Sequence, residues 1–132
     1  MDDIAYLYDG SLEGLLSAVF TAYQRHEDPI DVITPDHAQL RLGQQSLEIE
    51  VDQEKVSRVH RKIIEIGGEQ IFEAVKHAAL SDDAQAGTIV YRYLRLVFQG
   101  TLSRRALAED FTHTEVMKLQ KLSRSVYHER HY

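Results

Sequence analysis

Hydrophobic and polar positions follow two different periods along this chain. Residues 4–8 form a short apolar and aromatic run that predicts a β-strand. The pair Asp9-Gly10 then signals a turn, and apolar residues recur every three or four positions from Leu12 to Tyr23, which predicts an amphipathic helix. Ser11 is well placed as the N-cap of that helix. The chain therefore opens with a strand, a turn and a helix.

Two more segments have the pattern of strands. Residues 30–34 form a short, largely apolar segment. Residues 47–51 alternate strictly, so we expect one buried face and one face that carries Glu48 and Glu50. The polar stretch 35–45 between them is expected to be a loop.

The second half of the chain is helical in pattern. Asp52 is expected to cap a helix that ends at Gly67-Gly68, and a second helix is expected over residues 69–80. A third helix is expected over about residues 84–99, with Gly100 closing it. A last helix begins near Thr112 or Thr114. The pair Arg104-Arg105 is expected in the link before that last helix.

This order of elements predicts the fold class. One strand, one helix, two strands and then four helices indicate an α+β fold, with a small two- to three-stranded sheet packed on a body of about five helices. We expect the first helix to pack beneath the first strand and against the helix over residues 84–99. The residues expected to meet there are Tyr6, Tyr8, Leu15, Leu16, Val19, Phe20, Leu94 and Val97.

Length and composition restrict the class of protein. A chain of 132 residues suits one domain spanning residues 1–132. The absence of cysteine excludes disulfides, thiolate zinc sites and Cys-ligated iron–sulfur clusters within these residues, and with them a radical-SAM core. No apolar run approaches the roughly 18 residues of a membrane span, and the acidic N-terminus is not a signal peptide. We therefore expect a cytoplasmic protein without membrane contact.

Charge is unevenly distributed. The net charge is −6, but residues 1–56 hold 3 Lys and Arg against 12 Asp and Glu, whereas residues 57–132 hold 12 against 9. If the basic residues of the second half share a face, they would track phosphates, with Tyr91, Tyr93 and Tyr127 available for base stacking. The acidic half should then point away. The candidate nucleic-acid contacts are Arg58, Lys62, Arg92, Arg95, Arg104, Arg105, Lys118, Lys121 and Arg124.

Simpler interpretations of these charges stay open. Such basic residues are more often solvated surface or paired with acids, here those of the acidic half, and Arg92 and Arg95 are also compatible with buried salt bridges. Lys55, Arg58 and Lys62 do share one face of their predicted helix, which favours at least one local basic cluster.

No set of residues spells out a reaction. His128 and His131 lie one helical turn apart, but no third ligand is evident, so we predict no metal site and no cofactor. The glycines form no phosphate-binding motif, and Ser11 is explained by helix capping, although a helix start of this kind can hold an anion. Whether the chain is an enzyme is left open.

Several motifs, in order along the whole chain, resemble one family. They are Tyr8-Asp9-Gly10-Ser11-Leu12-Glu13-Gly14, Val51-Asp52, Ala79-Leu80-Ser81, Tyr91-Arg92-Tyr93-Leu94-Arg95-Leu96-Val97-Phe98 and His128-Glu129-Arg130-His131. The chain resembles a bacterial DNA metabolism or repair family encoded beside a radical-SAM protein, some members of which are fused to a uracil-DNA-glycosylase-like domain. The resemblance implies that residues 1–132 are the N-terminal part of a longer protein.

The resemblance implies a function and partners. The expected role is an accessory or binding module of DNA metabolism that works with a radical-SAM protein. Two alternatives remain: a non-catalytic fragment of a DNA base-processing enzyme, and a protein–protein interaction domain without nucleic-acid contact. Because the last helix carries no stop signal, we also expect Val126 or Tyr127 to be exposed or to pair with a second copy, forming a homodimer through that helix.

Overall fold

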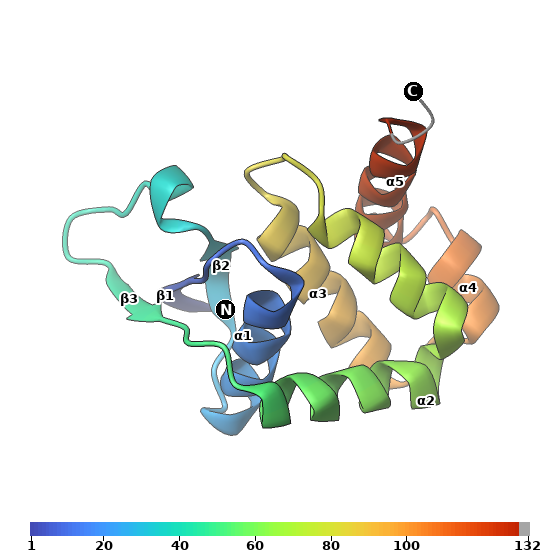
Figure 1. The fold of residues 1–132 in the computed structure, drawn as a ribbon, viewed down its shortest axis with the longest axis horizontal. Coiled ribbons are helices and arrows are strands. Elements are labelled where there is room, and N and C mark those ends of the chain that lie inside the picture. The colour runs from blue at the N-terminus through green and yellow to red at the C-terminus, as the bar shows by residue number, and fades with distance from the viewer. Residues whose placement is uncertain (130–132) are drawn as a thin grey trace.

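The structure, a computed structural model, describes the backbone of residues 1–129 and the side chains of residues 1–124. It has an α+β fold in which a small sheet lies beside a larger helical body (Figure 1). The elements in chain order are β1 (Asp2–Leu7), α1 (Leu12–Gln24), β2 (Pro29–Ile33), the 3-10 turn η1 (Pro35–His37), β3 (Gln45–Glu48), α2 (Gln53–Ala79), α3 (Ala86–Gln99), α4 (Arg104–Glu109) and α5 (Thr114–Glu129). The predicted fold class is confirmed.

The sheet has three parallel strands in the order β2-β1-β3, so the first strand is central. The third strand begins and ends earlier than predicted. The reason is that the chain turns toward α2 at Asp52, whose N–H donates to the Ser17 hydroxyl at 3.1 Å and whose carboxylate accepts from the backbone of Glu54. Glu50 and Val51 therefore lead into the helix instead of extending β3.

Helix α2 contains a sharp bend, visible as the corner of the green ribbon in Figure 1. The predicted break at Gly67-Gly68 is confirmed, because Gly68 has φ +83° and ψ 177° and separates two helical halves. Arg104 stabilises this corner by donating to the carbonyl oxygens of Glu65 and Ile66, both at 3.0 Å. These are carbonyls that the end of the first half leaves without a helical partner.

The segment before the last helix, predicted to be a link, contains a short helix. Residues 104–109 form the short helix α4, capped by Ser103, whose hydroxyl accepts from the N–H of Ala106. The six-residue helix carries too short an apolar pattern to be detected by periodicity, and a single leucine, Leu107, anchors it in the core.

Helix α3 closes the outer edge of β2. The Thr88 hydroxyl accepts from the N–H of Val32 at 3.0 Å and donates to its carbonyl oxygen at 3.2 Å. Arg92, one turn further along α3, donates to the carbonyl oxygen of Ile30 at 3.2 Å. These bonds satisfy polar groups that an edge strand would otherwise present to another chain.

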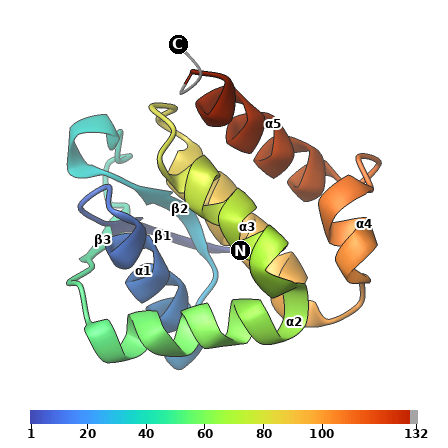
Figure 2. The same ribbon diagram turned by 45° about the vertical axis from the view of Figure 1, so that its right-hand side comes forward.

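The core runs from the sheet through α1 into the helical body. Leu15, Leu16 and Val19 are fully buried as expected, and so are Leu94 and Val97 on α3. Phe20 is different, since it packs against the core but stays partly exposed. The main partner of α1 is α2, and the contact of α1 with α3 is smaller. Figure 2 shows the second half of α2 side by side with α5 in the helical body.

Candidate functional site

Three aromatic side chains form a patch at the surface where α1, α2 and α3 meet. Phe20 and Tyr23 come from α1 and Phe98 from the end of α3. The rings of Tyr23 and Phe98 lie edge to face with centroids 5.8 Å apart, and 41% of Tyr23 is exposed. Together with Val19 and Val59 they line a shallow depression of about 340 Å³. We call Phe20, Tyr23 and Phe98 the aromatic patch.

Four cationic side chains surround the aromatic patch. Lys55 and Arg58 lie over the Phe20 ring, with Nζ and Cζ 5.7 and 6.0 Å from its centroid. The guanidinium of Arg95 lies 5.2 Å from the centroid of Tyr23. Lys62 lines the same depression. We call Lys55, Arg58, Lys62 and Arg95 the basic rim.

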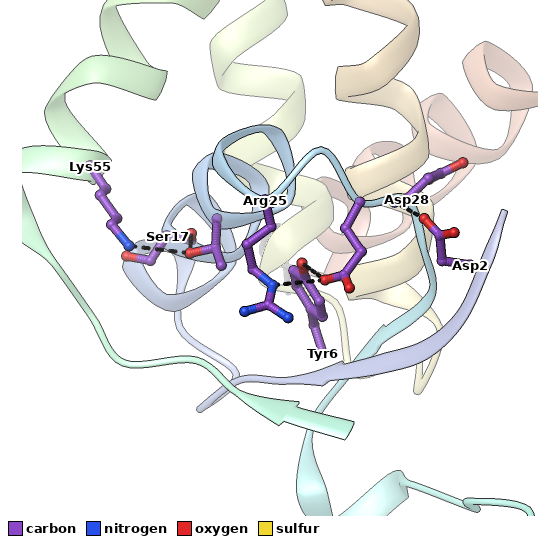
Figure 3. A network of polar contacts seen from close by, with 8 residues as sticks. Asp2, Tyr6, Ser17, Arg25, Asp28 and Lys55 are labelled. Carbon is purple, nitrogen blue, oxygen red and sulfur yellow. Dashed lines mark hydrogen bonds and ion pairs between the residues drawn. The ribbon is translucent and has the colours of Figure 1, made fainter. Parts of the chain in front are cut away.

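The geometry of α2 explains why three cations meet at one place. Positions 55, 58 and 62 recur at the three- and four-residue spacing of one helix face. The adjoining face carries Val59 and Ile63, which are buried. Burying that apolar face against α1 therefore places the three cations beside Phe20 and Tyr23. Lys55 also donates to the hydroxyl of Thr21 on α1 at 3.4 Å, a contact drawn at the left of Figure 3.

Arg95 is the most constrained member of the basic rim. Its Nη1 donates to the Tyr91 hydroxyl at 2.9 Å, and its Nε lies 3.6 Å from a carboxylate oxygen of Asp28. Burial alone would lower the pKa of this guanidinium, but the Tyr91 hydroxyl and the Asp28 charge outweigh burial and raise it. Arg95 does form a salt bridge, as the alternative interpretation predicts, but the pair is partly exposed and not buried. Arg92 bonds the carbonyl oxygen of Ile30 instead of a carboxylate.

The other cations of the rim are less constrained. Arg58 pairs with Glu54 at 3.2 Å on the helix surface, an exposed pair that contributes little stability. In the part of the chain that the structure describes, Lys62 has no ion pair. Two carboxylates, Glu54 and Asp28, therefore adjoin the rim, so the acidic N-terminal half does not point away from it completely.

A second group of predicted cations lies elsewhere. Arg92 on α3 and Lys118 and Lys121 on α5 line a groove between these helices. Arg92 and Arg95 are neighbours on α3, yet one faces the groove and the edge of β2 while the other faces Tyr23. The nine predicted residues therefore do not form one site.

The remaining three predicted cations serve local structure. Arg104 binds the two carbonyls at the bend of α2, Arg105 pairs with Glu109 at 3.3 Å within α4, and Arg124 lies 5.1 Å from the centroid of the Phe111 ring. The structure gives these residues contacts that account for them without a ligand.

The prediction that Tyr91 and Tyr93 stack on bases is wrong. Tyr91 and Tyr93 are fully buried, and burial raises the pKa of both. Tyr91 donates to Asp28 at 2.7 Å and Tyr93 to the carbonyl of Leu107 at 2.9 Å. The side chain of Tyr127 lies outside the described residues, as do those of Val126, His128 and His131. The rings that are at least partly exposed around the basic rim are instead Phe20, Tyr23 and Phe98, and Phe111 is exposed elsewhere, beside Arg124.

The start of α1 is occupied by the protein's own side chains. Asp9 accepts from the backbone N–H and the hydroxyl of Ser11, and these bonds lower the pKa of its carboxyl. The Ser11 hydroxyl in turn accepts from the N–H of Gly14 at 2.9 Å. A carboxylate already stands where an external anion would bind, so the capping interpretation explains this segment.

A polar network under the sheet offers no reactive group. The hydroxyl of Tyr6 donates to Glu27 at 2.5 Å, and Arg25 Nε donates to the same oxygen at 2.9 Å; Figure 3 shows Tyr6 and Arg25 converging there. Burial and the Glu27 carboxylate raise the pKa of Tyr6, so its hydroxyl keeps its proton. Among the described residues, no three His, Asp or Glu side chains gather as metal ligands.

Comparison with protein-family models, with curated proteins and with solved structures finds no match for this chain. The aromatic patch and its basic rim are therefore the surface features from which we infer a function. In the described part of the chain, no helix has the length and apolar character that crossing a bilayer requires.

Proposed function

We propose that this domain is an accessory binding module of DNA metabolism and that its aromatic patch and basic rim contact single-stranded nucleic acid. The observation that carries the proposal is the placement of four cations around three partly exposed rings. Flat rings stack on bases of any sequence, and cations beside them attract the phosphates that connect those bases. The family that the sequence resembles supports the same class of function.

The shape of the site favours a single strand over a duplex. The depression is shallow and apolar at its centre, with the cations at its margin. Duplex DNA hides its base faces, so it would use the cations and leave the rings without a partner. A single strand would use both. Binding should be indifferent to sequence and should weaken as salt rises.

The resemblance also supplies a partner. We propose that the module acts in the cytoplasm beside a radical-SAM protein, which would bring the cluster chemistry that this cysteine-free chain lacks. An enzyme fragment is less well supported, because no His, Asp, Glu, Ser or Thr side chain lines the depression of the aromatic patch among the described residues. A homodimer through α5 remains a separate proposal, since the residues expected to form it lie outside the described side chains.

Fluorescence anisotropy with labelled single- and double-stranded DNA at low salt tests the proposal. The variant Arg58→Ala/Lys62→Ala removes two rim charges, and Arg105→Ala/Lys76→Ala removes two exposed charges that pair with Glu109 and Glu73 elsewhere. We expect the first variant to lose affinity for the single strand and the second to retain it.

Two results would contradict the proposal. If both double variants lose affinity equally, net charge and not the rim attracts DNA. If the wild-type protein does not bind at high micromolar concentration, a protein–protein module becomes the better account, and retention of the neighbouring radical-SAM protein in a pull-down would then support it.

A further inference from the structure

A groove of about 530 Å³ lies between α3 and α5, away from the aromatic patch. Figure 2 shows these two helices, with α5 on the outer side of the helical body. The volume falls within the range of small-molecule sites in proteins. Its cations are Arg92 on one wall and Lys118 and Lys121 on the other, while Ile89 and Leu122 supply apolar surface between them.

Lys118 and Lys121 lie close enough on α5 for one anion to contact both. Lys118 and Lys121 are three residues apart on α5, so their side chains are neighbours on one face of the helix. Among the described residues, neither lies within ion-pair distance of a carboxylate. Neighbouring like charges on a helix repel each other. An anion bound between them would turn that repulsion into two attractions.

Arg92 adds a positioned cation on the opposite wall. Its Nη2 donates to the carbonyl oxygen of Ile30 and also contacts the sulfur of Met1 at 2.9 Å. These contacts hold the side chain against the edge of β2. A guanidinium has five N–H donors in a planar fork, so one held by a single nitrogen retains donors for a phosphate.

Two carboxylates on the groove restrict the ligand. The Asp83 carboxylate accepts from the N–H of Gln85 at 2.8 Å, and Glu115 lies 3.8 Å from Nδ1 of His113. Both are hydrogen-bond acceptors, and their charge disfavours a polyanion that fills the groove. They suit a ligand with one anionic group and additional hydroxyl or amino donors.

We infer that this groove binds the phosphomonoester of a nucleotide. The phosphate would lie among Arg92, Lys118 and Lys121, the base against Ile89 and Leu122, and the sugar hydroxyls or the base amino group near Asp83 or Glu115. A free mononucleotide and the phosphorylated end of a strand share this chemistry. The inference does not depend on strand binding at the aromatic patch.

Isothermal titration calorimetry with AMP, adenosine and inorganic phosphate tests the inference. We expect AMP to bind more tightly than either of its parts. Lys118→Ala/Lys121→Ala should weaken AMP binding by at least about tenfold, because each lysine would make a charge-assisted hydrogen bond to the phosphate. Both lysines are exposed, so the variant should melt at the wild-type temperature.

A matched variant separates a specific site from non-specific attraction of anions. Arg105→Ala/Lys76→Ala removes the same charge outside the groove, at residues paired with Glu109 and Glu73, and should leave AMP binding unchanged. Competition with oligonucleotides distinguishes the two sources of the phosphate. If a 5′-phosphorylated oligonucleotide displaces AMP and an unphosphorylated one does not, the groove binds the phosphorylated end of a strand, which still supports the site.

Three results would overturn the inference. They are an absence of binding at millimolar AMP, an affinity for inorganic phosphate equal to that for AMP, and an equal loss of AMP binding in Lys118→Ala/Lys121→Ala and in Arg105→Ala/Lys76→Ala.

Discussion

The Cα of Gly87 on α3 faces the carbonyl oxygen of Val32 on β2 so closely that no side chain fits between them. A methyl group there would overlap that oxygen and lie 2.8 Å from a ring carbon and from the hydroxyl oxygen of Tyr8. Gly87 thereby allows α3 to approach the edge of the sheet, and this approach positions both Arg92 and Arg95.

Replacing Gly87 with alanine should therefore destabilise the protein. In an open helix position the change would stabilise by roughly 0.5–1 kcal/mol, because alanine is the better helix former. Here the overlap with backbone should reverse the sign and cost about 1–3 kcal/mol. Urea unfolding measures the difference, with Gln99→Ala at an exposed position of α3 as the control. A stabilised Gly87→Ala variant would refute the close approach of α3 to β2.

Thr88→Val should destabilise the protein although it keeps the volume of the side chain. It removes both hydrogen bonds to Val32 and leaves a buried N–H and a buried carbonyl without partners, at a cost of about 1–3 kcal/mol. Thr88→Ser keeps the hydroxyl and should lose less. Equal melting temperatures for the two variants would show that the hydroxyl does not close this edge.

Protonation of Glu27 should lower the stability of the fold as the pH falls. Hydrogen bonds from Arg25 and Tyr6 lower the pKa of Glu27 below its ordinary value of 4.5. A carboxyl with a lowered pKa stabilises the fold above its unfolded-state pKa, and the contribution is lost as pH falls through the folded-state pKa. Chemical unfolding at pH 7 and below pH 4.5 should show that Glu27→Gln loses less stability on acidification than the wild type does. If the variant and the wild type lose the same stability on acidification, Glu27 does not contribute to the acid sensitivity of the fold.

Arg104→Ala should loosen the bend of α2. The change leaves the carbonyls of Glu65 and Ile66 without their donor, and we expect a loss of about 1–2 kcal/mol because the bonds are charge-assisted but exposed. Arg105→Ala breaks an exposed pair within α4 and should change stability by less than about 0.5 kcal/mol. Thermal melts of the two neighbouring variants provide the comparison, and a similar small effect for both would contradict the role of Arg104.

The sequence predicts the elements of this fold better than their contacts. Local signals such as Ser11, Asp52, Gly68 and Gly100 place helix starts, the bend and a helix end correctly, because each acts within a few residues. The edge closure by Thr88 depends on residues 56 positions apart in the chain, so no local pattern contains it.

The candidate site illustrates the same limit. Lys55, Arg58 and Lys62 are predictable as one helix face, but their aromatic neighbours are not. Phe20 and Tyr23 continue an apolar stripe that is otherwise core, and their partial exposure depends on how α2 and α3 pack around the end of α1, which no local pattern contains. Tyr91 and Tyr93 show the converse, since both rings are buried and their hydroxyls bond to Asp28 and to the carbonyl of Leu107, partners that the sequence does not reveal.

The affinity of Tyr23→Leu for single-stranded DNA tests the central claim most directly. Leucine preserves an apolar side chain at this partly exposed position but removes the flat ring beneath Arg95. Since stacking contributes roughly 1–3 kcal/mol per base, we predict at least about fivefold weaker binding of the single strand. Affinity for duplex DNA should change much less. Wild-type affinity of Tyr23→Leu for the single strand would contradict the assignment of the aromatic patch as the binding surface.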